Sequence, residues 1–220
     1  MYKRQAVKDI RIATTPQLKA DKDTSLIFID LAKGKKRMGG SILAQVNKQM
    51  GGDSPDVECL EEMPNFVEAI HKLLTDKKIL AYHDRSDGGL ITTLIEMSFA
   101  SRLGLEINLD TVLEDNKKLI DFLFNEELGV VIQVHTKDLD CVHDLLDESG
   151  LKDHSYTLGC ISAEKEINFS YRDEKILSFP LKALLENWHK VGFEIQSLRD
   201  NPVTAEAEFR YDTDISNSGL

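Results

Sequence analysis

The chain has 220 residues, of which 41% are hydrophobic and 30% are charged, so it can form the packed core of one large domain. Lys and Arg number 27 and Asp and Glu number 38; the resulting net charge of −11 repels phosphate backbones and disfavours nucleic-acid binding. No apolar run approaches the roughly 18–20 residues that cross a membrane, and the start carries no apolar secretory segment.

Apolar spacing predicts strands that alternate with helices along most of the chain. In chain order we expect a strand at 24–31, a helix at 42–50 with Leu43, Val46 and Met50 on one face, a helix at 63–77, a strand at 79–84, a helix at 90–102, a strand at 105–109, a helix at 115–125, a strand at 128–134, a helix at 137–148, two or three short strands over 154–178, and a helix at 180–198. The last helix carries Trp188 along with Leu184, Leu185, Val191 and Ile195, which we interpret as core residues.

These elements predict an α+β fold, a layered domain with a mixed sheet and helices packed on it. The alternation through residue 135 is typical of layered α/β folds, but the short strands over 154–178 break it. We expect a polar N-terminal connector at 1–22, a single domain at 23–200, and a linker or mobile tail at 201–220.

The most informative local feature is the segment 82–89, YHDRSDGG, in which a strand ends in a carboxylate and a Ser-Asp-Gly-Gly turn leads into a helix. Glycines let the backbone approach a ligand, and the N–H groups at a helix N-terminus favour phosphate. Asp84 or Asp87 could then hold Mg²⁺ together with phosphate oxygens. The alternative is an ordinary strand–turn–helix junction in which Asp87 caps the helix.

Two further polar segments are candidates for a site. Lys33, Lys35, Lys36 and Arg37 precede a Gly-Gly-Ser helix start, which suits either an anion or a solvated basic loop. It is not a Walker A motif, because the lysine of that motif is missing. The pair at 126–127, two glutamates between a helix and a strand, suggests a metal site or a cap across the fold, or simply polar residues that face water.

Several other chemistries have little support in this sequence. Cys59, Cys141 and Cys160 lie far apart without CxxC spacing, which indicates a reducing, cytoplasmic compartment. The six histidines form neither HxH nor HExxH, so a zinc hydrolase is disfavoured. No GxSxG motif occurs. We therefore assign no catalytic residue to this chain.

The ordered segments KDIRIATTPQL, SLIFIDLAKGKKRMGGSILAQV, AYHDRSDGGL, FNEELGVVIQV and SLRDNP resemble the large bacterial phosphoribosylformylglycinamidine synthases. The resemblance runs from about residue 6 to 203. It implies the fold of AIR synthase-related C-terminal domains, and specifically the C-terminal subdomain of the second synthetase half. That family makes formylglycinamidine ribonucleotide from formylglycinamide ribonucleotide, ATP and glutamine.

The same resemblance implies a role for two residues. Members of this family hold an auxiliary nucleotide, ATP or ADP, with Mg²⁺ in the second half; Asp84 matches a magnesium ligand and Ser86 a residue that contacts the nucleotide. The other ligands would come from the preceding subdomain. The implied partners are the remaining synthetase subdomains and the glutaminase domain of the same polypeptide, and we expect the isolated chain to be inactive.

Two alternatives belong to other functional classes. One is a structural interaction domain that binds no ligand and exposes an apolar patch to a neighbour. The other is a relative in the AIR synthetase and selenophosphate synthetase superfamily, including a stand-alone enzyme that phosphorylates a small molecule. The absence of a glycine-rich ATP-binding half from this sequence counts against the stand-alone enzyme.

Overall fold

A computed structural model describes residues 9–113 and 115–217. Within these residues, seven strands form one mixed sheet in the order β2-β4-β1-β5-β3-β6-β7. The strands are β1 (Thr24–Asp30), β2 (Ile79–Asp84), β3 (Gly104–Asn108), β4 (Gly129–His135), β5 (Ser155–Ser162), β6 (Glu166–Tyr171) and β7 (Glu174–Pro180). Among the neighbouring strands of the described chain, β3 and β6 pair in parallel and the other pairs are antiparallel. The predicted mixed sheet is confirmed.

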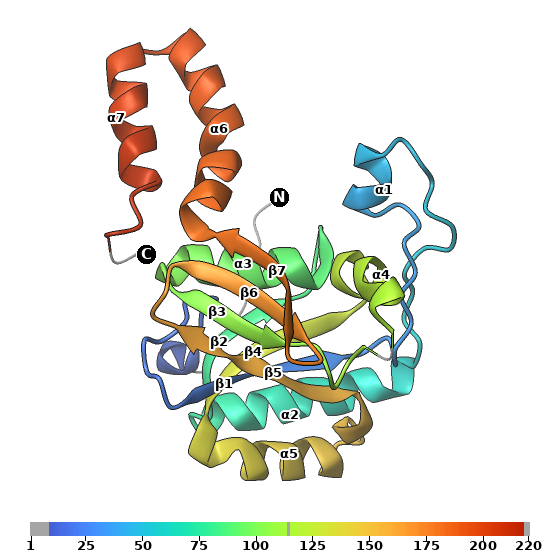
Figure 1. Ribbon diagram of the computed structural model, residues 1–220. Helices are drawn as coiled ribbons and strands as arrows, with labels where there is room; N and C mark the ends of the chain where they lie inside the picture. The colour runs from blue at the N-terminus through green and yellow to red at the C-terminus, as the bar shows by residue number, and fades with distance from the viewer. Residues whose placement is uncertain (1–8, 114, 218–220) are drawn as a thin grey trace.

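Helices cover both faces of this sheet (Figure 1). The α-helices are α1 (Ile42–Val46), α2 (Met63–Thr75), α3 (Gly89–Ser101), α4 (Leu119–Phe124), α5 (Leu139–Glu148), α6 (Leu181–Arg199) and α7 (Pro202–Asp212). Short 3₁₀ turns are η1 (Ile10–Ile12), η2 (Leu60–Glu62), η3 (Asn116–Lys118), η4 (Thr136–Asp138) and η5 (Lys152–His154). No helix in the described ranges is long and apolar enough to cross a membrane.

Strand β1 shows why the sheet needs helices on both sides. Leu26 and Phe28 belong to the apolar cluster under α3 and α4, whereas Ile27 and Ile29 belong to the cluster under α2 and α5. All four side chains are fully buried. A strand covered on both faces is continuously apolar, and this accounts for the unbroken run that predicted it.

The predicted N-terminal connector is partly packed against the domain. Thr15 accepts a hydrogen bond from the Tyr82 N–H at 3.0 Å, so the chain runs along the outer edge of β2. Leu18 is buried in the core, and Lys19 exchanges two hydrogen bonds with the Gln133 side chain. Residues 1–8 of the predicted connector lie outside the described residues.

Three sequence-based expectations about helices were wrong. The helix expected at 42–50 ends at Val46, and both Val46 and Met50 are exposed. On α6, Leu185 is buried and Leu184 packs against the core as predicted, but Trp188, Val191 and Ile195 are exposed and are not core residues. Residues 202–212 of the expected linker or mobile tail are not unstructured, because they form α7, which packs against α6. That this stretch leads to a further domain stays a prediction.

Candidate nucleotide and metal site

The sheet order brings three loops to one end of three neighbouring strands. β4 lies between β1 and β2 and runs antiparallel to both, so its beginning lies beside their ends. Asp30 pairs with Gly129, and Asp84 pairs with Val130. The basic loop after β1, the Ser-Asp-Gly-Gly loop after β2 and the two glutamates before β4 therefore meet at this edge of the sheet.

The two residues predicted to bind ligand, Asp84 and Ser86, lie exposed at the end of β2 and in the loop that follows it. Asp84 is the last residue of the strand, and Ser86 follows it by two positions. The Tyr82 hydroxyl donates a hydrogen bond to Asp84 Oδ1 at 2.7 Å, which orients the carboxylate. Burial, followed by the hydrogen bond to Asp84 and its charge, raises the pKa of Tyr82, so the hydroxyl keeps its proton.

Between these two residues, Arg85 turns inward and joins the three strand ends. Its Nη2 donates to Asp30 Oδ1 at 2.8 Å and to the Leu128 carbonyl at 2.8 Å, and its Nε donates to the Glu127 carbonyl at 2.5 Å. The guanidinium also lies 4.9 Å from the centre of the Phe28 ring. Burial lowers the pKa of Arg85, while the charge of Asp30 opposes this effect, and arginine stays protonated.

Arg85 and Asp30 together form a clamp, and Asp30 extends this clamp to the basic loop. Its two carboxylate oxygens accept hydrogen bonds from the Ala32 N–H at 3.2 Å and the Gly34 N–H at 2.8 Å. One buried ion pair thus fixes the backbone at the start of both loops.

The two glutamates at 126–127 accept hydrogen bonds from N–H groups in other parts of the fold and do not simply face water. Glu127 is fully buried, and its carboxylate accepts two hydrogen bonds from the Arg37 guanidinium, at 2.6 and 2.8 Å. Glu126 Oε1 accepts from the Ile42 N–H and the Gly88 N–H, both at 2.8 Å. Of the alternatives drawn from the sequence, the cap across the fold is the one the structure supports.

Most of the cationic side chains of the basic loop, residues 33–37, form ion pairs with acidic side chains. The sequence alone left the role of this loop open. Lys33 pairs with Glu62 at 2.5 Å and Lys35 with Glu58 at 2.7 Å, and Arg37 contacts both Glu58 and Glu127. Lys36 lies 5.5 Å from the centre of the Phe122 ring. These contacts fit neither a loop surrounded only by water nor a strongly cationic anion site.

The N-terminus of α3 is also engaged within the chain. Gly88 and Gly89 adopt left-handed backbone angles, with φ of 81° and 75°. Gly88 donates its N–H to Glu126, and Gly89 donates its N–H to the Ser86 carbonyl at 2.9 Å. For a phosphate to reach the Gly88 N–H, the Glu126 carboxylate has to move away.

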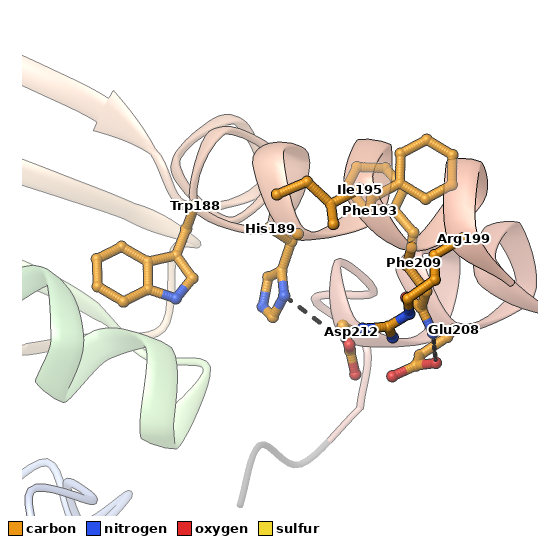
Figure 2. A pocket seen from close by; sticks show the side chains of 10 residues that line it. Trp188, His189, Phe193, Ile195, Arg199, Glu208, Phe209 and Asp212 are labelled. Atoms are coloured by element: carbon orange, nitrogen blue, oxygen red, sulfur yellow. Dashed lines mark hydrogen bonds and ion pairs between the residues drawn. The ribbon is translucent and has the colours of Figure 1, made fainter.

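Asp84 is a single carboxylate and not part of a complete metal site. Within the described ranges, no group of three or more His, Cys, Asp or Glu side chains is arranged to hold a metal. A cavity of about 650 Å³ lies between α3 and α6, and another of about 510 Å³ lies along α6 and α7 (Figure 2), but neither is lined by Asp84 or Ser86. The two residues leave one carboxylate and one hydroxyl exposed at this end of the sheet.

The fold and this strand-end site define a three-layer α/β/α domain with a mixed sheet and an acidic, glycine-containing loop at one end. Residues 28–172 match the family model described as AIR synthase related protein, C-terminal domain. The chain belongs to this family.

Solved structures with the same fold come from larger proteins. Thermotoga maritima PurL in complex with ATP matches with a TM-score of 0.62 at 14% identity, over 79% of this chain and 27% of that chain. Phosphoribosylformylglycinamidine synthase II from Thermotoga maritima matches at 0.61 and 13%, over 79% and 28%. Hydrogenase maturation protein HypE in complex with ATP matches at 0.51 and 14%, over 76% and 53%. This chain therefore spans less than a third of the PurL chains and about half of HypE.

Proposed function

We propose that this chain is the C-terminal subdomain of the second synthetase half of a phosphoribosylformylglycinamidine synthase. The observation that carries the proposal is the position of the resembling segments. AYHDRSDGGL, FNEELGVVIQV and the basic loop are far apart in the sequence, yet their polar ends share one edge of the sheet. The family membership and the coverage of about a quarter of a PurL chain support a subdomain of a longer polypeptide.

In this proposal the chain contributes part of an auxiliary nucleotide and magnesium site. Mg²⁺ is commonly held by one or two carboxylates together with phosphate oxygens, and Asp84 supplies one such carboxylate. Ser86 donates its hydroxyl to a phosphate of the bound ATP or ADP, and the turn at Gly88 permits close approach once the Glu126 carboxylate has moved away from the Gly88 N–H. The remaining metal ligands belong to the preceding subdomain, and the glutaminase domain of the same polypeptide supplies ammonia. The isolated chain is inactive.

Titration calorimetry with Mg·ADP tests the site. We expect the isolated chain to show no binding up to millimolar nucleotide, because it offers too few metal ligands. In a polypeptide that includes the preceding subdomain we expect micromolar binding, weakened at least about tenfold by Asp84→Ala. Asp87→Ala is the paired variant, since Asp87 is the other exposed carboxylate of this loop that the sequence allowed as a ligand, and it should leave the affinity unchanged if Asp84 holds the metal.

Two results would contradict this assignment. Micromolar binding to the isolated chain would mean that this domain carries the site largely by itself. Unchanged affinity in the Asp84→Ala polypeptide would remove Asp84 from the metal site. The reaction itself is tested by ADP release from the longer polypeptide, which should require both formylglycinamide ribonucleotide and glutamine.

A second candidate is a domain that only supports its neighbours. The observation in its favour is the set of large apolar side chains that stay exposed on α1, α6 and α7. This candidate predicts that Asp84→Ala leaves nucleotide binding by the longer polypeptide unchanged, so the titration above separates the two.

A further inference from the structure

Glu126 joins two segments that are far apart in the sequence through a single carboxylate oxygen. Its Oε1 accepts hydrogen bonds from the Ile42 N–H at the start of α1 and from the Gly88 N–H before α3, both at 2.8 Å. Both donors are uncharged backbone groups. Because the two bonds share one oxygen, each donor helps to hold the carboxylate in place for the other.

The segment that contains Ile42 forms a projection from the domain. The chain between β1 and α2 extends away from the sheet and carries α1 near its far end (Figure 1). We call residues 38–53 the tip of this projection. Hydrogen bonds close the tip on itself, because the Gly39 N–H donates to the Asp53 carbonyl at 2.7 Å and the Gly40 N–H to the Met50 carbonyl at 2.9 Å. The tip is therefore a small unit with its own internal bonds.

An open cavity lies between the tip and α4. It has a volume of about 480 Å³, and its lining includes Leu43 and Ala44 of the tip and Ile120 and Asp121 of α4. A space of this size means that the tip is not packed tightly against α4. The tip can therefore shift relative to this helix at little cost in packing.

The two neighbouring glutamates differ in how firmly they are held. Glu127 is fully buried and binds the Arg37 guanidinium, at the base of the projection, through both carboxylate oxygens. Glu126 is only partly buried and bonds to neutral N–H groups. A two-point bond between opposite charges is stronger than hydrogen bonds in which one partner is neutral. The Glu127 contact is therefore the fixed anchor, and the Glu126 contact is the one that another anion can replace.

We propose that Glu126 is a latch that couples the nucleotide site to the tip; this inference rests on the proposed function. With the site empty, the carboxylate occupies the Gly88 N–H and holds the tip through the Ile42 N–H. A nucleotide phosphate that takes the Gly88 N–H displaces the carboxylate and loosens the tip. The coupling is reciprocal, so release of the tip makes Glu126 easier to displace and strengthens nucleotide binding.

Ile42→Pro tests the latch without changing any charge. Proline lacks the N–H that donates to Glu126, and residue 42 is the first residue of α1, a position that proline favours. Ser41 has a φ of −58° and a ψ of 155°, the extended conformation that suits a residue before proline. The helix should therefore persist while the bond to Glu126 is lost. Ile42→Ala is the matched control, because it shortens the same side chain and keeps the N–H.

Amide hydrogen exchange of the isolated chain, followed by NMR, gives the first result. We expect Ile42→Pro to speed exchange of the Gly88 N–H about three- to tenfold, the effect of one hydrogen bond, and Ile42→Ala to leave it unchanged. Glu126→Ala should speed exchange of both the Gly88 and the Ile42 N–H. Unchanged Gly88 exchange in Ile42→Pro would overturn the proposal, because the two donors would then act independently.

Titration of the longer polypeptide with Mg·ADP gives the second result. Ile42→Pro should lower the dissociation constant about three- to tenfold, although residue 42 lies outside the proposed nucleotide site. Ile42→Pro added to Glu126→Ala should have no further effect, because the latch is already removed. Weaker or unchanged binding in Ile42→Pro would overturn the coupling, as would the same gain in affinity with and without Glu126.

The two experiments separate this inference from the proposed function. A longer polypeptide that binds no Mg·ADP would refute the proposed function, while Gly88 exchange in the isolated chain still decides whether Glu126 is a shared latch. Mg·ADP binding that Ile42→Pro does not change would refute only the coupling.

Discussion

Arg85→Met is expected to lower the free energy of unfolding by about 3–5 kcal/mol, because it leaves a buried carboxylate without its charged partner. The Asp30 side chain is only 6% exposed and the Arg85 side chain 1%. The change also removes donors from the Glu127 and Leu128 carbonyls. Urea unfolding followed by circular dichroism measures the difference.

Asp30→Asn, and the double variant that combines it with Arg85→Met, distinguish the free energy contributed by the ion pair from that of the surrounding hydrogen bonds. Asp30→Asn should cost less than Arg85→Met, because an amide oxygen in the Oδ1 position still accepts from the Ala32 N–H and from Arg85, so that only the hydrogen bond from the Gly34 N–H is lost. The double variant should be less destabilised than the two single effects combined, since neither charge is then left alone in the core. If Arg85→Met lowers the free energy of unfolding by less than about 1 kcal/mol, the buried ion pair does not stabilise the fold as we propose.

The clamp formed by Arg85 and Asp30 could be predicted from the sequence only in part. The period of two along a strand places Arg85 on the opposite side from Asp84, and a carboxylate that ends a fully apolar strand, such as Asp30, requires a buried partner. Which cation serves Asp30 depends on β4 lying between β1 and β2. A single sequence does not contain the strand order, so the meeting of the three loops could not be predicted.

The helical hairpin formed by α6 and α7 was also predicted only in part. The heptad spacing on α6 predicts a helix correctly, but periodicity identifies an apolar face without saying what covers it. For α7 a local signal was present and missed. Asn201 caps the helix by accepting from the Val203 N–H at 2.9 Å, and Pro202 occupies the first turn, a pairing typical of helix starts.

Gly89→Ala is the second change with a large expected effect, a loss of more than about 3 kcal/mol. Gly89 opens α3 with a φ of 75°, a conformation that costs an L-residue about 1–2 kcal/mol. An alanine Cβ would also lie 2.6 Å from the Leu123 carbonyl oxygen and 2.7 Å from the Asn125 carbonyl oxygen. Both neighbours are backbone, so α3 and the segment before the glutamate pair have to separate.

Gly34→Ala is the control that isolates backbone strain from the clash. Gly34 has a φ of 80°, but a Cβ there meets nothing within 4 Å, so only the cost of about 1–2 kcal/mol remains. The difference between the two alanine variants in urea unfolding measures how tightly α3 is held against residues 123–125. If both lose the same free energy, the close approach at Gly89 does not constrain the loop. If Gly89→Ala loses more, this approach holds Gly88 within reach of Glu126 and keeps the loop that carries Asp84 and Ser86 in place.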